Sequence, residues 1–274
     1  ADISAMGITQ YQMIKKPSRH LACQSVMAAA PSLYHVGAYQ GGGFKRALVY
    51  RWLMGNNFPV HVLKMMLANV DYNGVWEMVD STPDVANARV PVVHFAGWYD
   101  MFLQGNLDMF NNIQENGGPG ARGRQRLIVG PWTHNGFLGL RTRKQGEFEY
   151  PENSLYDILK ISAWFEECLR GYDRGFMDGP AVRYYVMGDP EDPDAPGNEW
   201  RRSDTWPPAG VETVPFYFHR SGTLGEEMPA EKNGALSFID DPADPVPTVG
   251  GANLVLDAGP RDQREIEKRH DVLT

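Results

Sequence analysis

Short apolar runs alternate with amphipathic stretches along the first part of the chain. Three apolar runs, each bounded by turn residues, are typical of strands buried in a parallel sheet. Between the second and third runs, residues 101–115 carry apolar side chains at positions 103, 107, 110 and 113, the spacing of a helix packed on a sheet. Strand, helix and strand in this order predict a βαβ unit and a parallel sheet. The predicted strands are 25–31, 90–96 and 126–130.

Further helices are predicted around these strands. Residues 5–16 form a helical stretch that Pro17 ends, and residues 154–170 form another with Ser154 as its N-cap. Between the first and second strands, residues 37–88 hold amphipathic pieces and a polar loop. We interpret this long segment as a mostly helical insertion in the sheet.

The pattern changes after Gly179. Residues 181–187 and 214–219 are strand-like, and the loops between them are rich in Pro, Gly and Asp. No helical pattern returns until the charged tail near 261–270. We therefore expect a β domain to begin here, with too few strands in the sequence to close a sandwich.

The bulk composition narrows the classes of partner. The chain has 274 residues, 42% of them hydrophobic, and a formal net charge of −8, which would repel nucleic acid and anionic membranes. We expect neither as a partner, and no apolar run approaches the roughly 18 residues of a membrane span. Two cysteines are too few for a disulfide framework, and we interpret Cys23 and Cys168 as buried small hydrophobes.

Three residues stand in the contexts that a serine hydrolase needs. Ser4 opens the first predicted helix, Asp100 closely follows the second predicted strand, and His134 follows the third. Catalytic groups collect at the carboxyl ends of strands in open parallel sheets. The order Ser, Asp, His is the order of α/β-hydrolases. The three residues are therefore candidates for a catalytic triad.

The local sequence around Ser4 leaves alternatives open. The backbone N–H of Ala5 would be one oxyanion donor, while Asp2 stands where a nucleophile elbow usually has glycine. Both Ser4 and Asp100 could instead be plain helix N-caps. The sequence begins just before Ser4, so we expect the chain to be a piece of a longer protein, and cytoplasmic, periplasmic and secreted locations all stay open.

The other histidines and the glycine-rich segment offer weaker chemistry. His94 lies inside a predicted strand, where we expect a core histidine, and the remaining five lack a strand-end context. No pair of histidines has zinc-like spacing, and the glycine run 41–43 lacks the Gly-Lys-Ser/Thr ending of a phosphate loop. We therefore expect no metal and no other cofactor.

Taken as a set, the motifs resemble the X-Pro dipeptidyl-peptidase, cocaine esterase and α-amino-acid ester hydrolase (glutaryl acylase) family of serine hydrolases. The matching stretches are 3–7, 90–100, 127–134, 241–247, 259–264 and 271–273. The resemblance implies a partial α/β-hydrolase core with a helical cap insertion, followed by the start of a jelly-roll-like β domain. The implied divisions are 1–36 (elbow, helix and strand of the core), 37–88 (cap), 89–178 (remainder of the core) and 179–274 (β domain).

The resemblance also implies roles for single residues. Ser4 would be the nucleophile, Asp100 the orienting acid and His134 the general base, with Trp98 and Phe102 lining the acyl pocket. The substrate would be a small-molecule ester, amide or short peptide, and a homo-oligomer is compatible with the family. Family members draw a second oxyanion donor from a tyrosine upstream of the nucleophile, a region that this sequence does not include.

Two questions stay open at this stage. The chain is either a working hydrolase or a catalytically inert fragment or binding module of a hydrolase-like protein. A peptidase would also need acidic groups to hold a substrate amine. We interpret the acidic residues of the cap as solvated surface residues, namely Asp71, Glu77, Asp80 and Asp84.

Overall fold

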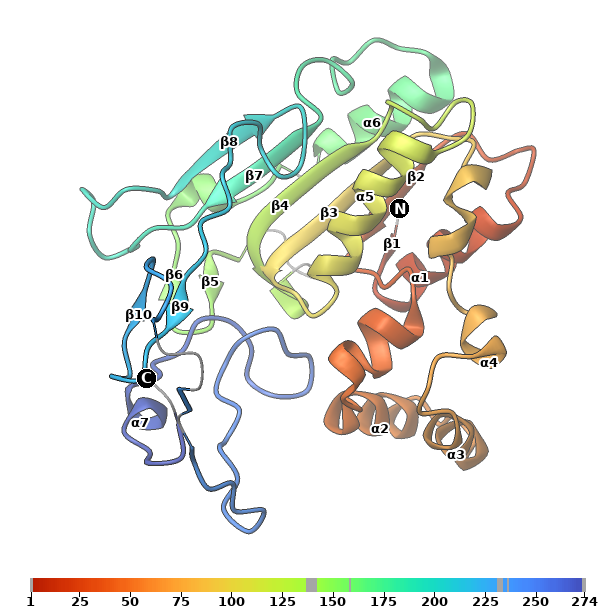
Figure 1. Ribbon diagram of the computed structural model, residues 1–274. Coiled ribbons are helices and arrows are strands. Elements are labelled where there is room, and N and C mark those ends of the chain that lie inside the picture. The colour runs from red at the N-terminus through yellow and green to blue at the C-terminus, as the bar shows by residue number, and fades with distance from the viewer. Residues whose placement is uncertain (1, 137–141, 158, 231–233, 236, 273–274) are drawn as a thin grey trace.

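The computed structural model describes residues 2–136, 142–157, 159–230, 234–235 and 237–272. Its centre is a six-stranded sheet in the order β1-β2-β3-β4-β7-β8 (Figure 1). All neighbours pair in parallel except β8, which runs antiparallel to β7. This mixed, mainly parallel sheet confirms the predicted α/β class. The strands are β1 (Asp2–Ile3), β2 (Gln24–Met27), β3 (Val92–Tyr99), β4 (Arg126–Thr133), β7 (Val182–Val186) and β8 (Glu199–Ser203).

Helices cover both faces of the sheet. Helices α1 (Ala5–Gln12) and α5 (Leu103–Asn116) lie on one face, and α6 (Leu159–Arg170) lies on the other. Successive side chains of β3 point to opposite faces of the sheet: Val92 packs with α1 and α5, and Val93 packs with α6. Burial on both sides explains why these strands appear in the sequence as continuous apolar runs.

The predicted elements are present with shifted ends. The first predicted strand stops at Met27, and the next residue, Ala28, has a φ of 43° that ends the extended backbone. Helix α6 begins at Leu159, because residues 152–154 form a separate 3₁₀ turn. Ser154, the predicted N-cap, therefore lies inside that turn. The free thiols of Cys23 and Cys168 both pack with the cluster beneath α6.

The segment between β2 and β3 is mostly helical, as its pattern predicts. It packs a small core of its own around Tyr34, Tyr39 and Trp76. Figure 1 shows α2 and α3 as a pair set apart from the sheet. The elements are η2 (Leu33–Ala38), η3 (Gln40–Gly42), α2 (Arg46–Gly55), α3 (Val60–Ala68), α4 (Gly74–Glu77) and η4 (Thr82–Asn87).

The chain after α6 differs from the expected β domain. Strand β7 pairs with β4, and the fully buried Val182 lies opposite Leu127, so 182–203 extends the central sheet across the predicted boundary at 179. The change in composition marks the end of the helices and not the end of the sheet. Among the described residues after β8, the only sheet is the pair β9 (Tyr217–Phe218) and β10 (Leu224–Gly225). A jelly roll therefore stays a prediction.

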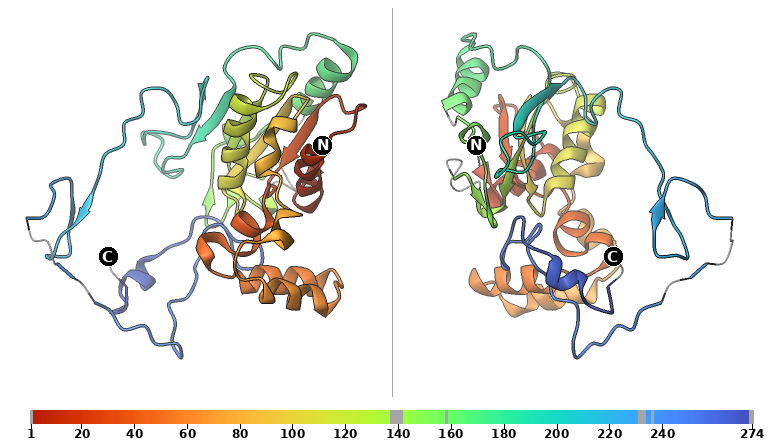
Figure 2. Two further views of the ribbon diagram at one scale, coloured as in Figure 1. Left: turned by 45° about the vertical axis from the view of Figure 1, so that its right-hand side comes forward. Right: turned by 90° about the vertical axis from the view of Figure 1, so that its left-hand side faces the viewer.

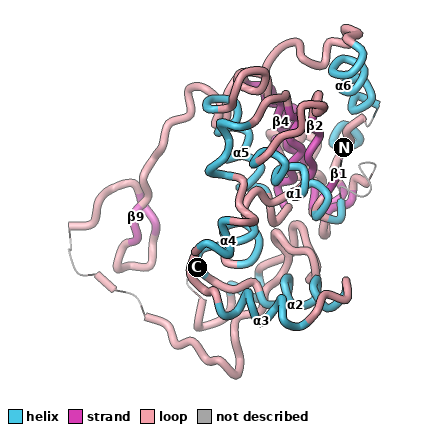
Figure 3. Tube along the Cα trace, turned by 90° about the vertical axis from the view of Figure 1, so that its right-hand side faces the viewer, coloured by secondary structure: helices cyan, strands magenta, loops and turns pink. Residues whose placement is uncertain are grey.

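Most of this C-terminal part is an extended loop, which runs away from the central sheet and then turns back towards it (Figures 2 and 3). Its returning part meets a small hairpin of β5 (Lys144–Gln145) and β6 (Phe148–Glu149), where the Glu147 N–H donates to the Pro260 carbonyl at 3.0 Å. A short helix, α7 (Arg264–Glu267), follows. Within the described ranges, no helix has the length and apolar character that crossing a bilayer requires.

Candidate active site

Ser4 sits on a sharp turn between β1 and α1. Its backbone has φ 58° and ψ −127°, and its N–H donates to the Met27 carbonyl of β2 at 3.0 Å. A non-glycine residue in this region costs roughly 1–3 kcal/mol, and such strain is typical of functional turns. The geometry is that of a strand-to-helix elbow which lifts the side chain out of the sheet. The Ser4 side chain makes no capping hydrogen bond to α1, so the plain N-cap interpretation does not hold.

Ser4, His134 and Asp100 form one chain of hydrogen bonds. The distance from His134 Nε2 to Ser4 Oγ is 2.9 Å, and the distance from His134 Nδ1 to Asp100 Oδ2 is 2.6 Å. Asp100 is 2% exposed and His134 4%. Folding thus brings together three residues that are far apart in the sequence, each at the carboxyl end of a strand.

Asp100 serves the local turn and the histidine at once. Its Oδ1 accepts a hydrogen bond of 2.7 Å from the Phe102 N–H, while its Oδ2 faces His134. The capping interaction and the contact with the imidazole therefore use different oxygens of one carboxylate. Holding both oxygens fixes the orientation of the group that faces the ring.

The backbone around Ser4 supplies a donor for a developing negative charge. Ala5 is the first residue of α1, so no carbonyl within that helix can accept its N–H. This N–H follows Ser4 directly, at the positive end of the helix dipole. An oxygen atom next to Ser4 Oγ could accept a hydrogen bond from it.

The two predicted pocket residues are placed differently. The Phe102 ring stands edge-on to the His134 ring at 5.5 Å and belongs to a buried apolar cluster beside it. Trp98 packs on Trp206 and donates its indole N–H to the Tyr185 carbonyl at 2.6 Å. A register shift between Gly97 and Tyr99 falls at Trp98 in β3. The structure therefore brings Phe102 to His134 and places Trp98 in another part of the core.

Three residues near the site carry no signal in the sequence. Leu48 of α2 and Leu254 of the C-terminal loop pack against the cluster that contains Phe102. Lys45, at the start of α2, lies close enough to Asp100 for their charges to interact: burial lowers the pKa of the Lys45 ammonium and the Asp100 carboxylate opposes that change. Helix α2 and the distant loop thus contribute to the surroundings of the three hydrogen-bonded residues.

Within the part of the chain that is described, no group of three or more His, Cys, Asp or Glu side chains could hold a metal ion.

Sequence comparison places the chain among known hydrolases. A family model described as X-Pro dipeptidyl-peptidase (S15 family) matches residues 54–136, a stretch that includes Asp100 and His134. The cocaine esterase of Rhodococcus sp. (strain MB1 Bresler) is 33% identical over 233 residues. That match covers 81% of this chain and 38% of the relative, so the chain spans well under half of that protein's length.

Solved structures show the same fold. An aminopeptidase from the marine sediment archaeon Thaumarchaeota archaeon superposes with a TM-score of 0.78 at 19% identity, over 99% of this chain and 50% of that one. An α-amino acid ester hydrolase gives 0.66 at 16% identity, over 89% and 46% of the two chains. A CocE/NonD family hydrolase from Staphylococcus aureus gives 0.58 at 18% identity, over 82% and 38%.

The fold is therefore that of an α/β-hydrolase of the CocE/NonD type. The chain is similar to the X-Pro dipeptidyl-peptidase (S15) family over residues 54–136, and the cocaine esterase is a relative of it. The family resemblance expected from the sequence motifs is confirmed.

Proposed function

We propose that the protein is a serine hydrolase that cleaves an ester or amide bond through an acyl-enzyme on Ser4. The observation that carries this proposal is the continuous relay from Asp100 through His134 to Ser4, with its two distances of 2.6 and 2.9 Å. The sequence comparisons support the same reaction class, since the sequence relative is an esterase and the matching family model is that of a peptidase.

The first half of the reaction forms the acyl-enzyme. His134 Nε2 takes the proton of the Ser4 hydroxyl as Oγ attacks the substrate carbonyl carbon. The carbonyl oxygen gains negative charge, and the Ala5 N–H donates a hydrogen bond to it. When the tetrahedral intermediate collapses, the bond to the leaving group breaks and His134 returns the proton to that group. The acyl group is then held on Ser4 Oγ.

The second half regenerates the enzyme with water. His134 takes a proton from water, whose oxygen attacks the acyl carbon, and then returns the proton to Ser4 Oγ as the acid product leaves. Asp100 stays ionised throughout, keeps the ring in one tautomer and stabilises the imidazolium that forms in each half. Phe102, edge-on to the same ring, would line the space for the acyl group. Small esters, amides and short peptides are the substrates that this site supports.

Substitution of Ser4 tests the proposal. We expect Ser4→Ala to lower the turnover of an activated ester such as 4-nitrophenyl acetate by about 10³-fold or more, because the nucleophile is removed. The matched control is Ser18→Ala, since Ser18 is exposed and takes no part in the hydrogen bonds that join Ser4, His134 and Asp100. Unchanged turnover in Ser4→Ala would refute the assignment and favour the inert-fragment alternative.

A further inference from the structure

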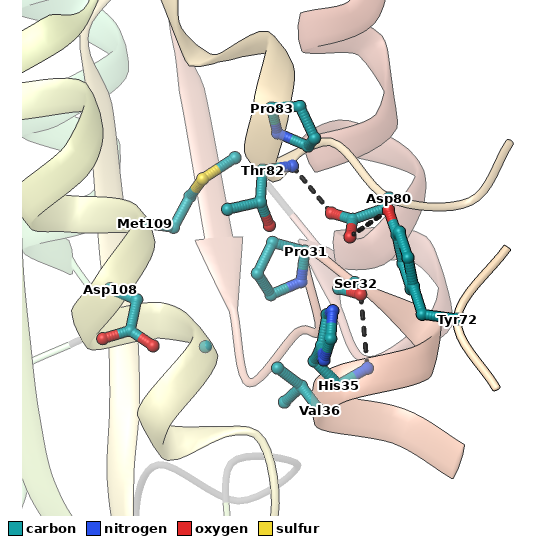
Figure 4. Close-up of a pocket in the computed structure, with 11 residues that line it drawn as sticks. Pro31, Ser32, His35, Val36, Tyr72, Asp80, Thr82, Pro83, Asp108 and Met109 are labelled. Atoms are coloured by element: carbon teal, nitrogen blue, oxygen red, sulfur yellow. Dashed lines mark hydrogen bonds between the residues drawn. The ribbon is translucent and has the colours of Figure 1, made fainter. Parts of the chain in front are cut away.

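A partly open cavity lies beside α5 and the edge of the cap, and neither Ser4 nor His134 lines it. Its volume is about 410 Å³, within the usual range of small-molecule sites. Figure 4 shows the loop and helix residues that surround it. The lining residues are Pro31, Ser32, His35, Val36, Tyr72, Asp80, Thr82, Pro83, Gly105, Asp108 and Met109.

Asp80 brings a buried carboxylate to this cavity. The sequence predicts a solvated side chain, but Asp80 is only 3% exposed, because its backbone bridges to Ser32 and draws it inward. Its Oδ1 accepts from the Thr82 N–H at 2.8 Å and its Oδ2 from the Tyr72 hydroxyl at 3.0 Å. Both donors are neutral, so neither balances a negative charge.

No cation among the described residues pairs with the Asp80 carboxylate. The nearest lysine, Lys15, donates to the main-chain carbonyl of Asp80 at 2.9 Å and lies 3.9 Å from the Asp84 carboxylate. The Asp80 carboxylate thus forms no ion pair with a described residue, and each of its oxygens can accept one further hydrogen bond. Burial, together with the hydrogen bond and charge of Asp80, raises the pKa of Tyr72 to about 12, so its hydroxyl stays a donor at neutral pH.

The rest of the lining suits a cation with an apolar body. The rings of His35 and Tyr72 stack at 4.9 Å between centroids with a tilt of 23°, and aromatic faces attract cations. Asp108 of α5 adds a second carboxylate, which Figure 4 shows on the opposite side of Pro31 from Asp80. Apolar walls come from Pro31, Val36, Pro83 and Met109.

We propose that this cavity binds a small organic ammonium ion, held by the carboxylates of Asp80 and Asp108 and by the stacked rings of Tyr72 and His35. Ser4, Asp100 and His134 are not among the residues that line this cavity. Val36 lines the cavity and also belongs to the cluster with Phe102, so one buried apolar layer separates the ammonium site from His134. The proposal does not depend on the reaction proposed for Ser4.

Calorimetric titration with phenethylamine at neutral pH tests the site, with 2-phenylethanol as the uncharged probe. We expect saturable one-site binding of the amine and binding of the alcohol that is at least about tenfold weaker. Asp80→Asn and Asp108→Asn should each weaken amine binding by about tenfold, because each removes a charge-assisted contact. Asp84→Asn is the matched control and should bind within about twofold of the wild type, because this nearby carboxylate does not line the cavity.

Several results would overturn the proposal. Equal binding of the amine and the alcohol would show that charge plays no part. Loss of binding in Asp100→Asn with full binding in Asp80→Asn would put the amine at the Ser4 site instead. If circular dichroism shows that Asp80→Asn does not fold, the test relies on Asp108→Asn, because Asp108 is exposed. Amine binding with wild-type affinity in Asp108→Asn would then contradict the proposed site.

Discussion

The Oε1 atom of Gln145 accepts a hydrogen bond of 2.9 Å from the backbone N–H of Thr133, the residue directly before His134. Gln145 is 2% exposed and lies in the β5–β6 hairpin, outside the central sheet. The Thr133 hydroxyl in turn accepts from the Gly136 N–H at 3.1 Å. The hairpin thus holds the end of β4 from which His134 reaches Ser4.

Gln145 is therefore expected to position His134. We predict that Gln145→Ala lowers kcat/KM for an activated ester by about 10–100-fold, since small displacements of a catalytic group are costly. Gln145→Glu keeps an acceptor and should recover part of the loss, which a merely structural defect would not explain. The control Gln40→Ala alters an exposed glutamine and should match the wild type. Equal rates in all three variants would exclude this role.

Asp100 has a separable contribution to the rate. Asp100→Asn keeps its one oxygen for the Phe102 N–H and then presents an amide NH2 group to His134 Nδ1. We predict a loss in kcat of about 10⁴-fold, because the imidazolium loses its counter-charge and the tautomer changes. The exposed Asp71 of the cap gives the control, Asp71→Asn. Steady-state kinetics decide, and a loss below about tenfold in Asp100→Asn would contradict the relay.

Phe102 should set the size of the acyl group. Phe102→Ala opens space beside His134, so we predict that the kcat/KM ratio of a butyryl over an acetyl ester rises by about tenfold. Trp98→Phe should leave this ratio unchanged, since Trp98 packs on Trp206 instead. A chain-length series of 4-nitrophenyl esters measures both variants. If the butyryl-to-acetyl ratio changes in Trp98→Phe and stays at the wild-type value in Phe102→Ala, the acyl pocket is lined by Trp98 and not by Phe102.

His94 makes stability depend on pH away from the active site. Burial lowers the pKa of His94 from 6.5 to about 4, an effect that its hydrogen bond to Gln125 partly offsets. Below pH 6.5 the unfolded chain binds the proton, whereas the folded protein does so only near pH 4. The stabilisation is therefore complete above pH 6.5 and is lost as the pH falls towards 4.

We predict that the free energy of unfolding falls by up to about 3 kcal/mol across this window. Urea unfolding at about pH 7 and about pH 4.5 measures the change. His94→Gln should flatten the slope by about one proton, whatever its effect on absolute stability. His61→Gln, at an exposed histidine of α3, should keep the wild-type slope. An unchanged slope in His94→Gln would assign the pH dependence to other groups.

The sequence predicts the sheet and the candidate relay for one physical reason. Asp100 and His134 each lie where an apolar run gives way to polar residues, and parallel strands bring such positions to one edge. Ser4 has no such run before it and is a candidate through the order Ser, Asp, His and through the family resemblance. The structure forms the turn with Asp2 in the place of the usual glycine, and Ser4 itself adopts the strained φ of 58°. The local sequence pattern cannot show whether Asp100 caps a turn or orients a histidine. In the structure it does both, because one carboxylate oxygen accepts from the Phe102 N–H and the other faces His134.

Other placements depend on the whole fold and leave no local pattern. Trp98 lies at a register shift in β3 and packs on Trp206, and periodicity does not predict either feature. Leu254 reaches the cluster around Phe102 only through the return of a long loop. The sequence predicts that Asp80 is a surface residue, whereas in the structure its backbone bridges to Ser32 and its side chain is buried. The composition of the chain changes before β7, while β7 continues the central sheet beside β4, so composition does not mark the end of the sheet.

Covalent labelling with a fluorophosphonate, followed by peptide mass spectrometry, tests the central claim most directly. The reagent phosphonylates a serine only when a neighbouring base activates it. The account predicts a single adduct on the peptide that contains Ser4, with labelling abolished in Ser4→Ala and strongly slowed in His134→Ala. An unlabelled protein, or an adduct on another serine with Ser4 unmodified, would contradict it.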